Sequence, residues 1–203
     1  PVGRLGDVPL ASPLETDMRL PTSALLVPVL LASCVLSMSA ASGIAQQTNP
    51  DPWQPVRYLD GAWEGTSTGE GGAGTARRTY TFVLKNRYLH ERNVSTYPPQ
   101  KKNKAGEVHE HWSFISYDRA RRTLVLRQFH PEGFVNQYLV NSAESTPTKL
   151  VFDSERFENY DNTARARETY EVISADEFIA TFELGEPGKP LQMYSRNHFK
   201  RIK

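Results

Sequence analysis

The sequence predicts an all-β protein, a single antiparallel up-and-down β-barrel of about ten strands with a short helical turn before the first strand. Two observations predict this fold. Short segments rich in Thr, Val, Tyr and Phe alternate polar and apolar residues with a period of two. Turn-forming residues separate these segments at regular spacing, which is typical of an antiparallel barrel or sandwich.

A single helical turn is expected within Trp53–Gly61, and no segment after it has a convincing helical pattern. The expected strands are Ala62–Ser67, Arg77–Leu84, Tyr88–Thr96, Glu107–Tyr117, Thr123–His130, Phe134–Val140, Lys149–Glu155, Arg165–Ile173, Glu177–Leu184 and Gln192–Ile202. The connectors carry turn chemistry, as in "KN", "HPEG", "SAD" and "GEPGKP". Each strand is therefore expected to pair with its neighbour in the chain.

Alternation within the strands predicts which side chains face the barrel interior. Residues 77–84, 165–173 and 177–184 each carry one apolar and one polar row. The apolar rows comprise Tyr80, Phe82, Leu84, Ala166, Tyr170, Val172, Phe178, Ala180, Phe182 and Leu184. Glu168 shares the inward side with Tyr170, and a buried carboxylate needs a partner. That partner is expected to be either a core arginine or a bound ligand.

The 203 residues divide into four predicted segments. Residues 1–17 show no periodicity and read as an upstream extension, with translation starting at Met18. Residues 18–45 have the layout of a secretory signal peptide: a basic start, a short apolar run, and small residues at the −3 and −1 positions of a cleavage site. Residues 46–56 are a polar, proline-punctuated linker, and residues 57–203 form the barrel.

The sole cysteine, Cys34, offers an alternative mode of export. "LASC", ending at Cys34, is similar to a bacterial lipobox, in which the cysteine carries a lipid anchor. The apolar residues that follow it and the site at "GIAQQ" favour ordinary cleavage instead. We therefore expect a periplasmic or secreted protein, with a lipoprotein anchored through Cys34 as the alternative. The remaining chain has no disulfide in either case.

Charge composition argues against nucleic acid as the main partner. Removal of residues 1–45 leaves 22 Lys and Arg against 20 Asp and Glu, counted from the sequence. Proteins that bind nucleic acid carry a marked excess of basic residues. The basic cluster at Gln100–Lys104 follows two prolines and is interpreted as a solvated loop.

Several motifs resemble calycin barrels, the superfamily of lipocalins, fatty-acid-binding proteins and haem-binding nitrobindins. "LDGAWEG" (Leu59–Gly65) is similar to the Gly-x-Trp entry of their first strand. "RYLHERNVSTY" with "GEVHEHWSFIS", the turn in "FHPEGFVNQYLV" and the closing "MYSRNHFKRIK" are similar to nitrobindin segments. "LKNRYLHE" and "FISYDRARR" resemble a bacterial calycin-like domain family of unknown function. The resemblance spans residues 57–203 and implies a ligand cavity inside the barrel.

The resemblance also implies haem as a possible cofactor, but the chain departs from the nitrobindin pattern. In that family a histidine on the last strand binds the haem iron from inside the barrel. His198 is the last-strand candidate here, and alternation groups it with Gln192, Tyr194 and Arg196 in a polar row. His111 also stands where the family carries a glutamate. Haem ligation by His198 would need a bulge that changes the facing of the strand.

His109 and His111 share one face of a strand and raise a second possibility, a metal-dependent cupin. That family adds a glutamate four or five residues later and a histidine in a second motif. Ile115, Ser116 and Asn136 occupy those positions here. A transition-metal site needs at least three good ligands, so the sequence predicts no metal site. His109, His111 and His198 are weak candidates for metal ligands. The row with Trp112 and Phe114 is slightly favoured to face inward.

The best-supported function from sequence is therefore a small-ligand-binding barrel for a hydrophobic or amphipathic molecule, lipid-like or haem-like. The cavity is expected to be lined by apolar side chains and closed by polar ones at one end. The predicted set is Trp63, Tyr80, Phe82, Phe178 and Phe182, with Glu168, Arg92 and His130 at the polar end. Two alternatives stay open: an enzyme that uses these polar residues as acid and base, and a filled structural barrel without ligand.

Overall fold

A computed structural model describes residues 51–203 except 102 and 162. The predictions for residues 1–17 and 18–45, including the signal peptide and Cys34, lie outside the described residues, as do residues 46–50 of the linker 46–56. These predictions are not tested by the fold. The described part of the linker is ordered against the barrel, since Trp53 and Val56 are buried.

The described chain forms one closed antiparallel barrel of ten strands, which confirms the predicted fold class. A 3-10 helix, η1 (Gln54–Leu59), precedes the strands. The strands are β1 (Gly61–Gly69), β2 (Gly74–Val83), β3 (Tyr88–Tyr97), β4 (Glu107–Asp118), β5 (Thr123–Phe129), β6 (Val135–Val140), β7 (Lys149–Glu158), β8 (Arg165–Ser174), β9 (Glu177–Gly185) and β10 (Gln192–Arg201).

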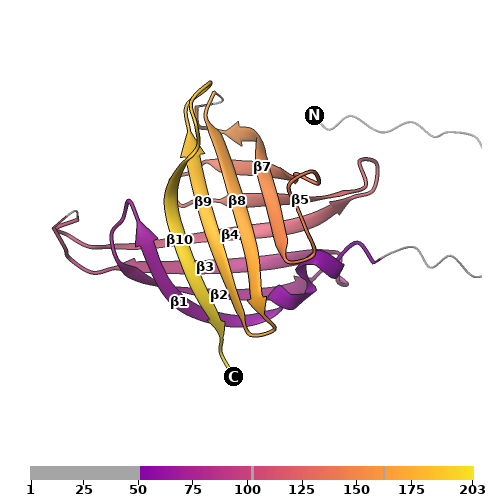
Figure 1. The fold of residues 1–203 in the computed structure, drawn as a ribbon, viewed down its shortest axis with the longest axis horizontal. Coiled ribbons are helices and arrows are strands. Elements are labelled where there is room, and N and C mark those ends of the chain that lie inside the picture. The colour runs from indigo at the N-terminus through magenta and orange to yellow at the C-terminus, as the bar shows by residue number, and fades with distance from the viewer. Residues whose placement is uncertain (1–50, 102, 162) are drawn as a thin grey trace, which may run out of the picture. The chain divides into compact units, whose positions relative to one another are not determined.

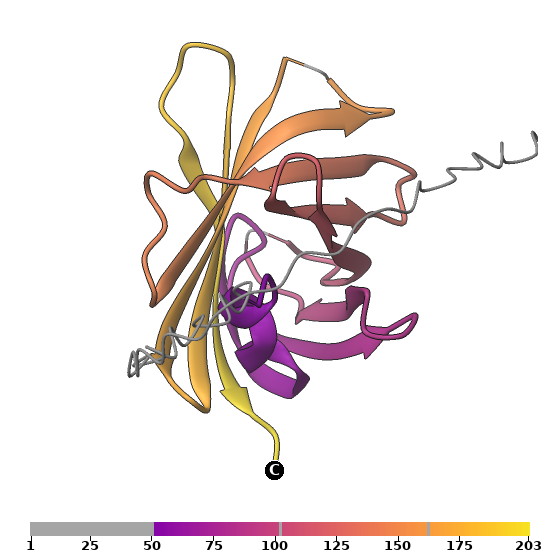
Figure 2. The ribbon, with the colours of Figure 1, turned by 90° about the vertical axis from the view of Figure 1, so that its right-hand side faces the viewer.

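Each strand pairs with its neighbours in the chain, and β1 pairs with β10 to close the sheet. Figure 1 shows β8, β9 and β10 in front, crossing the more horizontal β2 to β5 behind them, as strand tilt in a barrel requires. Figure 2 shows the same two walls from the side, with η1 in the lower half. Among the described residues, no helix has the length and apolar character that crossing a membrane would take.

The barrel interior is divided into an apolar end and a polar end. The apolar end is packed with large side chains that are almost completely buried: Trp63, Tyr80, Leu89, Ile115, Leu126, Tyr138, Phe152, Tyr170, Phe178 and Phe199. Burial of each such apolar side chain contributes about 1.5–3 kcal/mol to folding. The inward rows predicted for β2, β8 and β9 are confirmed, with one exception. Leu84 is 71% exposed because it lies in the tight turn after β2 with a positive φ.

Helix η1 closes the apolar end. Val56 and Leu59 are buried, and the Trp63 indole donates a 2.7 Å hydrogen bond from Nε1 to the Leu59 carbonyl. The Arg201 guanidinium lies 4.1 Å above the Trp63 ring and donates to the Tyr58 and Asp60 carbonyls at 2.7 Å. The first and last parts of the barrel are thus fastened to the helix, and the interior at this end is filled by buried side chains.

The Gly-x-Trp-x-Gly motif has a steric reason. At Gly65, β1 approaches β10 so closely that an added Cβ would lie 2.0 Å from the His198 carbonyl oxygen. Only glycine fits this position, because the obstruction is backbone and cannot turn away. The motif therefore serves the closure of the barrel as much as the burial of Trp63.

Two predictions about facing were wrong. Trp112 and Phe114 lie on the outer wall, where Trp112 is 48% exposed and stacks edge-on against His90. Arg92 is also outside, with Nε and Nη2 donating to both carboxylate oxygens of Glu110 at 2.7 Å. The inward rows of β3 and β4 are instead partly polar and include Glu91, Asn93, His109 and His111.

We predict that Gly65→Ala destabilises the protein by about 3 kcal/mol, the upper part of the range for overpacking, because its Cβ would overlap the β10 backbone. Gly71→Ala is the matched control, since its Cβ would meet only the Tyr97 ring at 3.2 Å, and it should cost about 1 kcal/mol or less. Urea unfolding followed by tryptophan fluorescence measures both. Equal losses for the two variants would contradict the steric explanation.

Candidate functional site

The polar end of the barrel encloses a pocket of about 370 Å³. It lies beneath the loops that follow β1, β3, β5, β7 and β9, opposite η1. Its outer walls are mainly aromatic and comprise Tyr97, Phe134, Phe157, Tyr160, Phe182 and Tyr194. Its floor, next to the apolar core, is polar and comprises Arg78, Asn93, Gln128, Asn136, Glu168 and Asn197. The pocket thus joins an apolar mouth to a buried set of hydrogen-bonding groups.

A buried ion pair lies in the pocket floor. The Arg78 side chain is 4% exposed, and its Nε lies 3.2 Å from Oε1 of Glu91, which is equally buried. Arg78 also donates to Asn93 Oδ1 at 2.9 Å and to the Tyr80 hydroxyl at 3.2 Å. Burial alone would raise the pKa of Glu91, but Arg78, with His111 and Ser113, outweighs it and lowers that pKa to about 2. Glu91 is therefore ionised at neutral pH.

Glu168 behaves differently although it lies in the same floor. It accepts one hydrogen bond, from Gln128 Nε2 at 3.2 Å. Burial raises its pKa to about 7, and the nearby positive charge of Arg78 only partly opposes this shift. Glu168 is therefore shared between its acid and carboxylate forms at neutral pH and can donate to or accept from a ligand. The arginine expected as its partner is engaged chiefly with Glu91.

Three histidines meet at one side of the pocket. His109 and His111 project inward from β4, and His130 follows the end of β5. One ring nitrogen from each lies within 4.8 Å of the others. The ring centroids are 5.4–5.9 Å apart. Burial, followed by the neighbouring His111 and His109, lowers the pKa of His130 to about 3, so its imidazole is neutral at physiological pH.

The turn after β5 aims His130 into the barrel. The His130 amide donates to the Phe134 carbonyl at 3.1 Å, and the Gly133 amide donates to the His130 carbonyl at 2.9 Å. The His130 ring stacks on Phe134 with centroids 4.2 Å apart. The "HPEG" turn therefore supplies backbone bonds that leave the imidazole free to face the pocket.

Each histidine ring has one nitrogen close to another polar side chain. His109 Nδ1 lies 3.5 Å from Glu132 Oε1, and His111 Nε2 lies 3.6 Å from Glu91 Oε1. His130 Nε2 lies 3.3 Å from the Asn136 side-chain amide. The second nitrogen of His130, Nδ1, is buried without a hydrogen-bond partner among the described residues.

The predicted ligand-binding residues separate into three groups. Glu168, His130 and Phe182 line the pocket. The others do not: Trp63, Tyr80 and Phe178 fill the apolar core, and Phe82 packs against Trp53 at the closed end. Arg92 is outside the barrel, as described above. Trp63, Tyr80, Phe82 and Phe178 lie outside the pocket because the inward side of a strand can face either the packed core or the cavity.

The weak metal candidate His198 lies on the outer face of β10, where its Nε2 is 2.6 Å from Glu177 Oε1. The bulge in β10 falls between Met193 and Ser195 and leaves this facing unchanged. The sequence reasoning missed the meeting of His111 with His130. A signal existed: the short turn at Arg119–Arg122 pairs Asp118 with Thr123, and counting outward from it sets His111 opposite His130.

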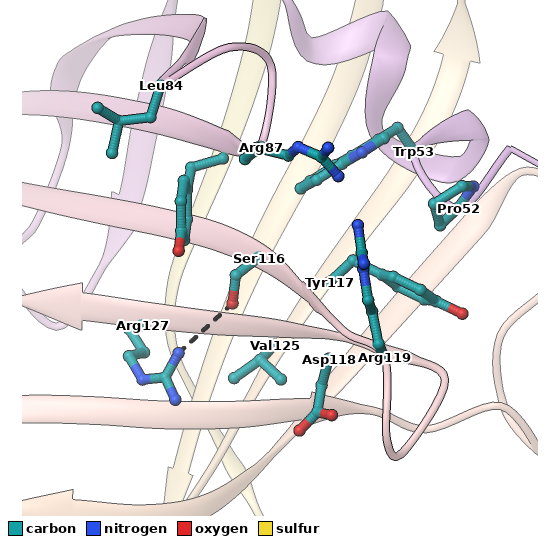
Figure 3. Close-up of a pocket in the computed structure, with 11 residues that line it drawn as sticks. Pro52, Trp53, Leu84, Arg87, Ser116, Tyr117, Asp118, Arg119, Val125 and Arg127 are labelled. Carbon is teal, nitrogen blue, oxygen red and sulfur yellow. Dashed lines mark hydrogen bonds between the residues drawn. The ribbon is translucent and has the colours of Figure 1, made fainter. Parts of the chain in front are cut away.

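A more open cleft lies on the outer wall near η1, and Figure 3 shows its lining. Arg87, Arg119 and Arg127 surround it, and Arg127 donates to the Ser116 hydroxyl at 3.4 Å. Asp118 is used by its own turn, where it accepts from the Ala120 and Arg121 amides. This cleft lacks the enclosed polar floor of the barrel pocket, which is therefore the better candidate site.

Fold and site together define the class of this protein: a closed antiparallel barrel with an internal pocket at one end. A solved structure with a similar fold is "Crystal Structure of Rv2717c from M. tuberculosis", at a TM-score of 0.56 and 14% identity, covering 76% of this chain and 99% of that one. The structure of EF1p2_mFAP2b bound to DFHBI matches at a TM-score of 0.35 and 12% identity, covering 75% and 100%. No family model and no curated protein matches the chain.

We predict that Glu168 makes stability fall as the pH rises. Its pKa is about 7 in the folded protein and near 4.5 when unfolded, so its favourable contribution is complete below pH 4.5 and is lost as the pH rises through 7. The free energy of unfolding of Glu168→Gln minus that of the wild type should therefore rise by about 2–3 kcal/mol between pH 4 and 8. Glu91 stays ionised and Arg78 stays charged over this range.

Urea unfolding at several pH values measures this difference. Glu171→Gln, on the outer face of the same strand, is the control for removal of a carboxylate from β8. A difference for Glu168→Gln that does not change with pH would show that the carboxyl is not held protonated by burial.

Proposed function

We propose that this protein binds a small amphipathic molecule in the pocket at the polar end of its barrel. The observation that carries the proposal is the pocket itself, with aromatic walls and a polar floor. Its volume of about 370 Å³ lies within the range of about 300–1,000 Å³ that is typical of small-molecule sites. The apolar core below it, fastened by η1, keeps the walls in place without help from a ligand.

Buried polar atoms in the floor support a ligand with a polar end. Asn136 Oδ1, Asn197 Oδ1 and His130 Nδ1 have no hydrogen-bond partner among the described residues. A buried polar atom left unpaired costs about 1–3 kcal/mol, so hydrogen bonds from a ligand would recover a substantial free energy. The floor offers both donors and acceptors, which suits a hydroxyl, amide or carboxylic acid group.

The charges of the floor favour a ligand that is neutral or singly acidic. Arg78 and Glu91 largely cancel one another. Glu168 can take or release a proton near neutral pH and so adjust to the charge of what binds. The apolar remainder of the ligand would lie among Phe182, Tyr160 and Tyr194 toward the mouth. His198, the last-strand histidine, faces away from the pocket, so haem would not be bound here through the last strand as it is in nitrobindins.

We predict that Phe182→Ala weakens binding of a medium-chain dansyl fatty acid by about 5–30-fold, equivalent to about 1–2 kcal/mol of lost apolar contact. Phe82→Ala is the matched control. It removes a phenyl ring that is also partly buried but lies at the closed end, so the affinity for the probe should stay within about twofold of wild type. Fluorescence titration of the dansyl group measures both affinities.

A ligand carried through purification would give independent support, and mass spectrometry of an organic extract would identify it. If the dansyl probe does not bind and the extract contains no small molecule, the chain is better regarded as a structural barrel. Equal weakening by the two phenylalanine variants would mean that the probe binds elsewhere.

A further inference from the structure

We propose that His109, His111 and His130 form a binding site for one divalent first-row transition ion, with Zn²⁺ as the best match. The site lies on the inner wall of the pocket between β4 and the end of β5. The proposal goes beyond the binding of an organic molecule and does not depend on it. It is carried by the geometry of the three rings and by the groups behind them.

The three donor atoms are close to metal-binding distance. Imidazole nitrogens bind Zn²⁺ at about 2.0–2.1 Å, which places nitrogens on a tetrahedral ion about 3.4 Å apart. The nearest nitrogens of this cluster lie within 4.8 Å of one another. Each ring therefore needs to move by only about 1 Å, within the reach of small side-chain rotations. The near-equal centroid separations place the three rings around a common centre rather than in a row.

The backbone that carries the rings is fixed in advance. His109 and His111 lie in the middle of the β3–β4 pairing, opposite Ser95 and Asn93. His130 is held by the turn that bonds its amide to Phe134 and stacks its ring on the Phe134 side chain. The site therefore has two ligands on β4 and a third directly after β5, the strand paired with β4. Ligands held on such rigid elements favour selective metal binding.

The groups behind the rings match the outer shell of a histidine metal site. A metal-binding histidine usually gives its other N–H to a carboxylate or a carbonyl oxygen. Glu132 and Glu91 carboxylates lie next to His109 and His111 in this way. The Asn136 amide lies next to His130, and turning it over brings its unpartnered Oδ1 onto Nε2. The buried and unpartnered Nδ1 of His130 is then the nitrogen that meets the ion.

Three imidazoles leave at least one coordination position open. All three come from the same wall of the barrel, so the open position faces the pocket. Sites with three protein ligands usually complete their coordination with water or a bound molecule. The ion would thus give the pocket a Lewis-acidic point for an oxygen donor, such as a carboxylate or a hydroxyl group. Neutral imidazole ligands select zinc, copper and nickel over magnesium and calcium.

The test is metal titration of the full chain without a polyhistidine tag, after removal of metals by a chelator. We expect one Zn²⁺ per chain by calorimetry, and Co²⁺ should give the visible absorption of a nitrogen-rich site of low coordination number. His130→Ala should weaken Zn²⁺ binding by about 100-fold or more, since even outer-shell changes cost 10–100-fold. His109→Gln, at a position where the side chain is 25% exposed, should do the same if His130→Ala does not fold.

The chain provides matched controls because it has five histidines, two of which lie outside the cluster. His198→Ala should leave Zn²⁺ affinity within about twofold of wild type, although it removes a histidine–glutamate pair on the surface. Glu132→Gln, half-exposed at the rim, should weaken binding by about tenfold without affecting the fold. These variants separate the cluster from adventitious binding by surface histidines.

The proposal is overturned if wild type binds no Zn²⁺, or if binding survives His130→Ala and is lost in His198→Ala. It is equally overturned if Co²⁺ binds with the spectrum of the hydrated ion. Because the titration uses the metal alone, its failure would leave the dansyl fatty-acid result intact, and failure of the fatty acid to bind would leave the metal result intact.

Discussion

The buried pair of Arg78 and Glu91 is the constraint on which the rest of the barrel depends. Two charges inside a barrel cost several kcal/mol each in lost hydration, and only close pairing with further hydrogen bonds offsets this. Asn93 and the Tyr80 hydroxyl supply those bonds. The register of β2 against β3 sets Asn93 opposite Arg78, and Tyr80 lies two residues along β2. On one side of the pair the interior is aromatic and filled. On the other it is polar and hollow.

The fold could be predicted because period-two alternation and turn chemistry are local. Facing was predictable on β2, β8 and β9, where the apolar row is also the inward row. The prediction of facing failed on β3 and β4, where the interior is polar. There the apolar Trp112 and Phe114 lie on the outer wall, and Arg92, which was predicted to face inward, lies outside as well. A slip of one residue exchanges the two rows, and hydrophobicity alone cannot decide between them where a pocket replaces the core.

The site was predictable in parts but not as a whole. The shared face of His109 and His111 follows from their spacing, and the position of His130 at the barrel mouth follows from the turn. Their meeting depends on the β4–β5 register, which a search for cupin spacing along the chain does not consider. Arg78 and Asn197 gave no signal, because a polar residue in an apolar row has the same pattern whether it binds a partner or faces solvent.

The separation of the two ends has a consequence for how such a barrel can be altered. Stability resides in η1, Trp63 and the aromatic core, whereas the pocket is lined by strand ends and by the loops after β1, β5 and β7. Changes in those loops should alter what the pocket admits while leaving the free energy of unfolding nearly unchanged. The chain is in this sense a modular scaffold, whose selectivity can be redesigned at one end while the other is left untouched.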